Sequence, residues 1–176
     1  MKRSGNIALL MMGVAAVAWT MTDTEEPADV AVYDSPEQCA GDGIYTEEQC
    51  QDEFATAEAE HANVAPRYNS SRDCYGDFGY NRCQQVGSGG YWIPFMMGYM
   101  LAPRSGMHTV ATQPLYRSSD DPFHYRTAYN QSVNGTKGLS RVSATATKPP
   151  RMRTKTVARG GFGSRAASSG GFSFGG

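Results

Sequence analysis

The sequence places four cysteines in two matched stretches, and this pattern constrains the fold more than any other feature. The first stretch, residues 33–50, reads "YDSPEQCAGDGIYTEEQC", and the second, residues 68–83, reads "YNSSRDCYGDFGYNRC". Each begins with a Tyr, an Asp or Asn and a Ser, and each places a Cys six residues after the Tyr. A second Cys follows after ten intervening residues in the first stretch and eight in the second. We therefore interpret residues 23–86 as a duplicated unit that holds one cysteine pair in each repeat.

The cysteines are better suited to structural disulfides than to a metal or a redox reaction. Zinc sites usually bring two ligands within two to four residues of each other, which neither pair does. A redox-active dithiol usually carries Cys-x-x-Cys, which the chain lacks. Four cysteines allow three pairings. The duplication favours Cys39–Cys50 with Cys74–Cys83, and the swapped pairing Cys39–Cys83 with Cys50–Cys74 is the alternative.

Helix-start signals accompany both repeats. Ser35 is followed by Pro36 and by a Gln three residues after the Ser, which is typical of a capped helix start. Thr46 opens a second capping box, and that helix is expected to end near Asn63. A third helix is expected to start at Ser70 or Ser71. We predict a small, mainly α-helical, disulfide-stapled unit.

Composition makes the disulfides important for stability. Leu, Ile, Val and Phe together number 25 of 176 residues, which is low for a globular core. A disulfide that closes a ring of this size stabilises by roughly 3 kcal/mol, and a unit with so few large apolar residues needs that contribution.

The N-terminus is typical of a secretory signal. Two basic residues precede the apolar run "IALLMMGVAAVAW", and Ala16-Val17-Ala18 offers a small-x-small cleavage site. We expect residues 1–22 to be a signal peptide or, alternatively, a retained N-terminal anchor. Either one places the protein outside the cytosol, in the periplasm or attached to a membrane of the cell envelope, where thiols pair.

Charge is distributed unevenly along the chain. Residues 23–61 contain 13 Asp or Glu and no Lys or Arg, whereas the chain after Asp121 contains 9 Lys or Arg and no acid. Two interpretations are open: two solvated surfaces of opposite sign that attract each other, or a basic tail that meets an anionic surface such as lipid headgroups or polysaccharide.

The segment 87–136 begins with a glycine-rich joint and continues with the apolar run "YWIPFMMGYML" (91–101). The run is too short to span a bilayer. It either packs as core or forms an exposed patch for a membrane or protein partner. The contact residues in the second interpretation are Tyr91, Trp92, Phe95, Met96, Met97, Tyr99 and Met100. A third interpretation is a Cu(I) site formed by Met96, Met97 and Met100 with Met107 and His108.

The remainder of the chain carries weaker patterns. Alternation at Phe123, Tyr125 and Thr127, with a turn at Asn134-Gly135, predicts a weak β-hairpin. Residues 137–176 have the Gly/Ser-rich, basic composition of a disordered tail. The cations that would meet an anionic surface are Lys148, Arg151, Arg153, Lys155 and Arg159.

Catalytic patterns are absent from the sequence. There is no phosphate-binding loop, no His-Glu-x-x-His and no Gly-x-Ser-x-Gly. One Arg-Gly-Gly at residues 159–161 is too little to indicate RNA binding. We therefore expect a protein that is not an enzyme, without catalytic residues, metal, cofactor, nucleic-acid partner or identified small-molecule substrate.

Several segments together resemble the YgiB-like family of bacterial envelope proteins. The resemblance rests on "SSRDCYGDFGYNRCQQ", "YWIPFMMGYML", "QPLY" and "RGGFG", and spans about residues 32–163. It implies an exported protein with two Cys pairs and a low-complexity tail. Some relatives carry a lipid-attachment Cys after the signal, where this chain has Ala18-Trp19-Thr20. Related genes often neighbour an ATP-grasp ligase resembling glutathionylspermidine synthase, which implies an alternative role as an accessory or binding subunit of that pathway.

Overall fold

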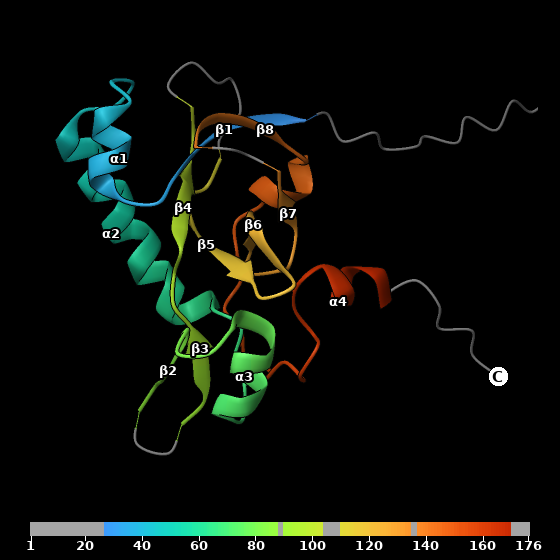
Figure 1. Ribbon diagram of the computed structural model, residues 1–176. Helices are drawn as coiled ribbons and strands as arrows, with labels where there is room; N and C mark the ends of the chain where they lie inside the picture. Colours follow the sequence, from blue (N-terminus) through green and yellow to red (C-terminus); the bar gives the residue numbers. More distant parts are fainter. Residues whose placement is uncertain (1–26, 88–89, 104–109, 135–136, 170–176) are drawn as a thin grey trace, which may run out of the picture.

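The centre of the protein is a six-stranded antiparallel sheet with the strand order β7-β6-β5-β4-β1-β8 (Figure 1). The computed structural model describes residues 27–87, 90–103, 110–134 and 137–169, so the predicted signal or anchor at 1–22 lies outside the described residues. The strands are β1 (Ala28–Tyr33), β4 (Gly98–Leu101), β5 (Gln113–Ser118), β6 (Asp121–Thr127), β7 (Ser132–Val133) and β8 (Gly138–Val142). A separate two-stranded ribbon contains β2 (Cys83–Gln85) and β3 (Trp92–Pro94).

Helices surround this sheet rather than forming the core. The α-helices are α1 (Pro36–Gly41), α2 (Glu47–Val64), α3 (Ser71–Phe78) and α4 (Ser164–Ser169), and η1 (Ala144–Thr147) is a 3-10 helix. In Figure 1, α1 and α2 lie along one side of the sheet and α3 lies below it, beside the β2–β3 ribbon. The prediction of a mainly α-helical unit was therefore wrong, because the chain is organised around a nearly closed antiparallel sheet.

The sheet was missed because its central strands are buried on both faces. In β1, Ala31 and Tyr33 pack beneath the helices, whereas Val30 and Val32 point into the inner cluster enclosed by the curved sheet. A strand covered on both sides has no alternation of polar and apolar residues, which is the usual sign of a half-buried strand. The β1 sequence, "ADVAVY", therefore gives little local indication of its structure.

The local helix signals are confirmed. Ser35 caps α1 by accepting a hydrogen bond from the Gln38 N–H, and Thr46 forms a full capping box with Gln49 at the start of α2. Ser70 caps α3 in the same way as Ser35 caps α1. These signals act within one turn of chain, so they are readable without knowledge of the tertiary fold.

The disulfides follow the pairing that the duplication favours. Cys39 is joined to Cys50 with a Cα–Cα distance of 5.8 Å, and Cys74 to Cys83 with a distance of 6.3 Å. The first disulfide ties α1 to α2, and the second ties α3 to β2. The two repeats diverge after their first cysteine, because the second Cys lies in a helix in one repeat and in a strand in the other.

The hairpin predicted around Phe123 exists, with a different turn. Strands β5 and β6 are joined through the turn at Ser119-Asp120, and β6 continues through a second turn into β7. Asn130 adopts a left-handed φ of 64° in that second turn. The predicted turn at Asn134-Gly135 falls partly outside the described residues.

The expectation of a disordered tail from residue 137 was also wrong over the described part. Strand β8 pairs with β1, and Ala146 of η1 closes the inner cluster. Farther along, Phe162 is 3% exposed and its ring lies 4.7 Å from that of Phe78. The Gly-rich composition that suggested disorder allows this segment to turn, because Gly160 and Gly163 have φ values of 76° and 98°.

The burial of Phe162 gives a direct test of this C-terminal packing. Phe162→Ala should lower the free energy of unfolding by about 3–5 kcal/mol, as for other large buried aromatic residues. The control is Phe123→Ala, because Phe123 is 84% exposed and its loss should change stability by no more than about 0.5 kcal/mol. Urea denaturation with the disulfides intact measures both. Equal, small effects of the two substitutions would contradict the packing described here.

Candidate functional site

Aromatic side chains gather on the part of the molecule held by the second disulfide. We call residues 68–87 and 90–95, which contain α3, β2 and β3, the aromatic lobe. The Tyr75 ring lies 6.0 Å from the Trp92 ring and 5.5 Å from the Tyr80 ring. Tyr80 is 81% exposed and Phe95 is 41% exposed, whereas Tyr75, Tyr91 and Trp92 are half-buried. The lobe therefore presents a connected aromatic surface supported by a disulfide-linked frame.

The exposed charge of the aromatic lobe is positive. Arg72 and Arg82 are both exposed, and neither forms an ion pair with another described residue. At the edge of the lobe, the Arg67 guanidinium lies 4.2 Å from the centre of the Tyr91 ring, in a cation–π contact. The two acids of the lobe are engaged internally. Asp73 accepts a hydrogen bond from the Ser70 hydroxyl, and Asp77 is buried and accepts one from the Tyr68 hydroxyl.

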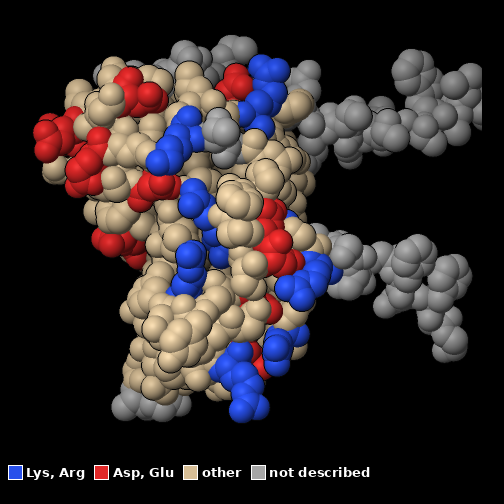
Figure 2. Space-filling view, viewed as in Figure 1, with Lys and Arg blue, Asp and Glu red and all other residues tan. Residues whose placement is uncertain are grey.

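The acidic side chains lie mainly on another part of the surface. Figure 2 shows them gathered over α1 and α2, while Lys and Arg lie over the strands and over α3. Asp29 and Asp34, which precede α1, form ion pairs with later basic residues: Asp29 with Arg141 at 3.1 Å, and Asp34 with Lys137 at 3.1 Å and with Arg117 at 3.4 Å. Acidic and basic side chains thus attract each other at β1 and the residue that follows it, and α1 with the beginning of α2 lies away from α3 (Figure 1).

Only part of the predicted contact run 91–101 is on the surface. Tyr99 and Met100 are fully buried in β4, on opposite faces of the sheet, so they are core residues and not contact residues. Met96 and Met97 are half-buried and also pack against these two different clusters. Phe95 is exposed, and it lies with the half-buried Tyr91 and Trp92 in the aromatic lobe.

The described methionines do not converge as a soft-metal site would require. Met96 packs with the cluster beneath the helices, whereas Met97 and Met100 both pack in the inner cluster on the other face, so the three do not share one cluster. The other two proposed ligands, Met107 and His108, lie outside the described residues. Within the described ranges, no group of three or more His, Cys, Asp or Glu is placed to hold a metal ion. No described helix is both long and apolar enough to cross a membrane.

The predicted basic tail is a docked segment rather than one continuous patch. Lys148, Arg151 and Lys155 are exposed. Arg153 instead packs with its guanidinium 5.2 Å from the Tyr129 ring and donates a 2.6 Å hydrogen bond to the Ala128 carbonyl. The Arg159 side chain lies across Gly76 of α3, where an added Cβ would be only 2.9 Å from the Arg159 Nε. Some of these cations therefore hold the segment in place.

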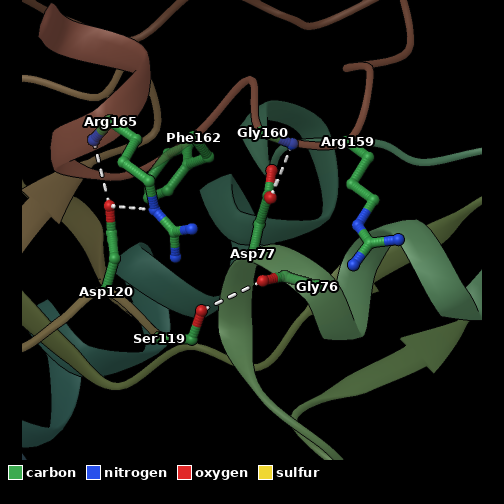
Figure 3. A pocket seen from close by; sticks show the side chains of 8 residues that line it. All are labelled: Gly76, Asp77, Ser119, Asp120, Arg159, Gly160, Phe162 and Arg165. Atoms are coloured by element: carbon green, nitrogen blue, oxygen red, sulfur yellow. Dashed lines mark hydrogen bonds and ion pairs between the residues drawn. The ribbon is translucent and has the colours of Figure 1, made fainter.

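Figure 3 shows a cavity of about 350 Å³ where residues 159–165 meet α3 and the β5–β6 turn. The Gly160 N–H donates a 2.7 Å hydrogen bond to Asp77, and the Arg165 N–H donates a 3.0 Å bond to Asp120. The Ser119 hydroxyl donates to the Gly76 carbonyl across the same cavity. Both carboxylates at this cavity thus accept hydrogen bonds from the C-terminal segment, and the arrangement fastens that segment to the lobe.

Contact with the C-terminal segment also affects the pKa of Asp120. Burial alone would raise its pKa, but the nearby Ser118 hydroxyl and the hydrogen bonds and charge of Arg165 hold the pKa of Asp120 below its usual value. Asp121 behaves similarly: burial is opposed by hydrogen bonding and charge from His124 and by the charge of Arg126, so its pKa is lowered. Both groups therefore favour the ionised, segment-bound state at neutral pH.

His61 is a half-buried titratable group of α2 that faces β5. Its Nδ1 lies 2.9 Å from the Tyr116 hydroxyl, and burial lowers the pKa of His61 to about 4 from its usual 6.5. In the unfolded chain this imidazole takes up a proton below about pH 6.5, while the folded protein keeps it neutral. The unfolded state therefore binds more protons in this range, and stability falls as the pH falls from about 6.5 towards 4.

His61→Gln should flatten this pH dependence, because Gln stays neutral and can still hydrogen-bond to Tyr116. The measurement is the free energy of unfolding in urea between about pH 7 and pH 4. Tyr116→Phe is the matched control: it lowers stability overall but should keep the wild-type slope, since burial is the cause of the shift. A His61→Gln profile as steep as that of the wild type would show that another group is responsible.

Comparison with known proteins places the chain in a family. Residues 27–173 match the family model described as "Protein of unknown function (DUF1190)". A UPF0441 protein of Sodalis glossinidius is 30% identical over 182 residues, covering 94% of this chain and 84% of the relative. Another from Erwinia tasmaniensis is 30% identical over 179 residues, covering 89% and 79%. One from Serratia proteamaculans is 27% identical over 186 residues, covering 94% and 84%.

No solved structure matches the chain. The family match covers most of the sequence, including both cysteine pairs and the segment that docks at the cavity of Figure 3. The YgiB-like resemblance is thereby confirmed: the curated relatives named above are UPF0441 proteins of bacteria, and the chain belongs to the DUF1190 family.

Proposed function

We propose that this is a non-enzymatic protein of the bacterial cell envelope that binds the surface of an anionic lipid bilayer through its aromatic lobe. The single observation that carries the proposal is the pairing of exposed aromatic rings with exposed arginines on one disulfide-held surface. Tyr and Trp are favoured at the boundary between lipid and water, and each basic side chain near an anionic membrane contributes about 1 kcal/mol.

The compartment is supported by the two disulfides. Such bonds persist in oxidising compartments and are rare in the bacterial cytosol. The basic and apolar N-terminal sequence agrees with export, because it has the composition of a secretory signal or anchor. A protein exported to the cell envelope meets anionic lipid headgroups on the membranes that border its compartment.

The charge distribution supports a defined orientation. Exposed acids, among them Glu37, Glu47, Glu48 and Asp52, belong to α1 and the first turns of α2. These parts lie away from α3 in Figure 1, and Figure 2 shows acidic side chains gathered on that side. An anionic surface repels this side of the molecule and attracts the side that carries Arg72 and Arg82. The lobe would therefore face the bilayer, with the ring of Tyr80 entering the headgroup region.

Binding to vesicles tests this proposal. The protein should co-sediment with phosphatidylglycerol vesicles more than with phosphatidylcholine vesicles. The double variant Arg72→Gln/Arg82→Gln should lower the partition coefficient about 30-fold, since two basic side chains contribute about 2 kcal/mol together. Tyr80→Ser should weaken binding further without loss of stability, because Tyr80 is 81% exposed.

The matched control is Lys137→Gln/Arg141→Gln, which removes the same charge from the β8 side of the sheet. It should retain most of the binding. Equal losses in the two double variants would show non-specific attraction by net charge. Unchanged vesicle binding in the lobe variants, with loss of one co-purified protein, would instead support the accessory-subunit role that the family resemblance implied.

A further inference from the structure

A second cavity, of about 660 Å³, lies where β5 and β6 approach η1 and the segment that follows it. Its volume is within the range of about 300–1,000 Å³ that is typical of small-molecule sites. Its lining includes Gln113, the first residue of β5, and Thr127, the last residue of β6, so it lies at one end of these two paired strands. The cavity is distinct from the aromatic lobe and from the cavity shown in Figure 3.

The floor of this cavity is fixed by buried polar side chains. Gln113 is 1% exposed, and its Nε2 donates a 2.9 Å hydrogen bond to the Ala146 carbonyl. Thr127 is also 1% exposed, and its hydroxyl oxygen accepts hydrogen bonds from the N–H groups of Tyr129 and Gln131, both at 3.3 Å. The strand ends and η1 are therefore joined before any ligand arrives, so the cavity is preformed.

One wall is built around Tyr129 and Arg151. The Tyr129 hydroxyl donates a 2.8 Å hydrogen bond to the Arg151 carbonyl and accepts a 3.0 Å bond from the Arg151 N–H. On the ring, the guanidinium of Arg153 stacks at 5.2 Å. These contacts fix the backbone of Arg151 at the rim, while its exposed guanidinium forms no ion pair within the described part of the chain.

The charge of the lining selects the class of ligand. The lining contains two cations, Lys148 and Arg151, and no Asp or Glu. The sequence after Asp121 contains no acid at all, so the segment 145–151 contributes no acidic side chain of its own to this wall. Pro149, Pro150 and the Tyr129 ring provide apolar surface beside these cations. A ligand that complements both the cations and the apolar surface has a negatively charged group and an apolar body.

We propose that this cavity binds a small organic carboxylate, whose carboxylate pairs with Arg151 and whose apolar body lies against Tyr129 and the two prolines. Arg is suited to this role because its planar guanidinium pairs with a carboxylate through two hydrogen bonds. The site does not depend on membrane binding, because its residues come from β5, β6, the turn after β6 and the segment 145–151, and not from the aromatic lobe.

Three six-carbon probes of different charge test the proposal: hexanoate, hexanol and hexylammonium. Amide NMR of the oxidised protein should show saturable shifts with hexanoate at Gln131, Thr145 and Arg151 and at the side-chain amide of Gln113. A ligand of this size is expected to bind with a Kd on the order of millimolar. Hexanol should bind roughly tenfold more weakly, and hexylammonium should give no saturable shift at these residues.

Substitutions identify the group that binds the carboxylate. Arg151→Gln should weaken hexanoate binding roughly tenfold, while Arg151→Lys should recover part of the loss. Arg141→Gln is the matched control, because Arg141 is exposed and lies on β8 outside this cavity; it should leave the Kd unchanged. The amide spectrum away from the cavity shows whether each variant remains folded.

Three results would overturn the proposal. One is equal binding of all three probes, which would mean an apolar groove without charge recognition. Another is hexanoate shifts spread over the basic surface without saturation. The third is an equal loss of affinity in Arg151→Gln and Arg141→Gln. None of these results bears on vesicle binding by the lobe, so the two proposals succeed or fail separately.

Discussion

The two disulfides are the constraint on which the rest of the structure depends, because they hold the short helices that satisfy buried tyrosine hydroxyls. The five largest fully buried side chains of the described chain are all tyrosines. Tyr33 donates to Asp42, directly after α1, and Tyr68 donates to Asp77 of α3. Burial and these contacts raise the pKa of both tyrosines, so each hydroxyl stays protonated. A core built from tyrosine requires its polar partners to be fixed in position.

The same constraint explains how one repeated pattern can support two different surfaces. Glu37 and Arg72 occupy the same position in the two repeats, four residues after the initial Tyr. The first repeat covers the sheet with an acidic helical surface, and the second forms the aromatic lobe with exposed arginines. Because a disulfide and a helix N-cap hold the backbone of each repeat, the exposed side chains of the two repeats can differ in charge without loss of the fold. This division places acids and arginines on separate parts of one small protein.

The sequence predicts what is local and misses what is brought together from a distance. Helix caps at Ser35 and Thr46 depend on residues within one turn, and the favoured cysteine pairing depends on a short repeated pattern. Both could be predicted from the sequence. Strands β1 and β8 pair although they lie far apart in the chain, and β1 carries no alternation because both of its faces are buried. At the candidate site, Tyr91, Trp92 and Phe95 could be predicted from their aromatic character. The contribution of Arg72 and Arg82 was missed, although comparison of the two repeats position by position would have indicated it.

The central claim is that this protein works in an oxidising compartment with both disulfides formed, so the most direct measurement is the thiol state in living cells. Free thiols are trapped by alkylation as the cells are lysed, and the intact protein is then mapped by mass spectrometry. The account predicts no alkylated cysteine, with peptides joined as Cys39–Cys50 and Cys74–Cys83. Recovery of intact, folded protein with four alkylated cysteines would contradict it.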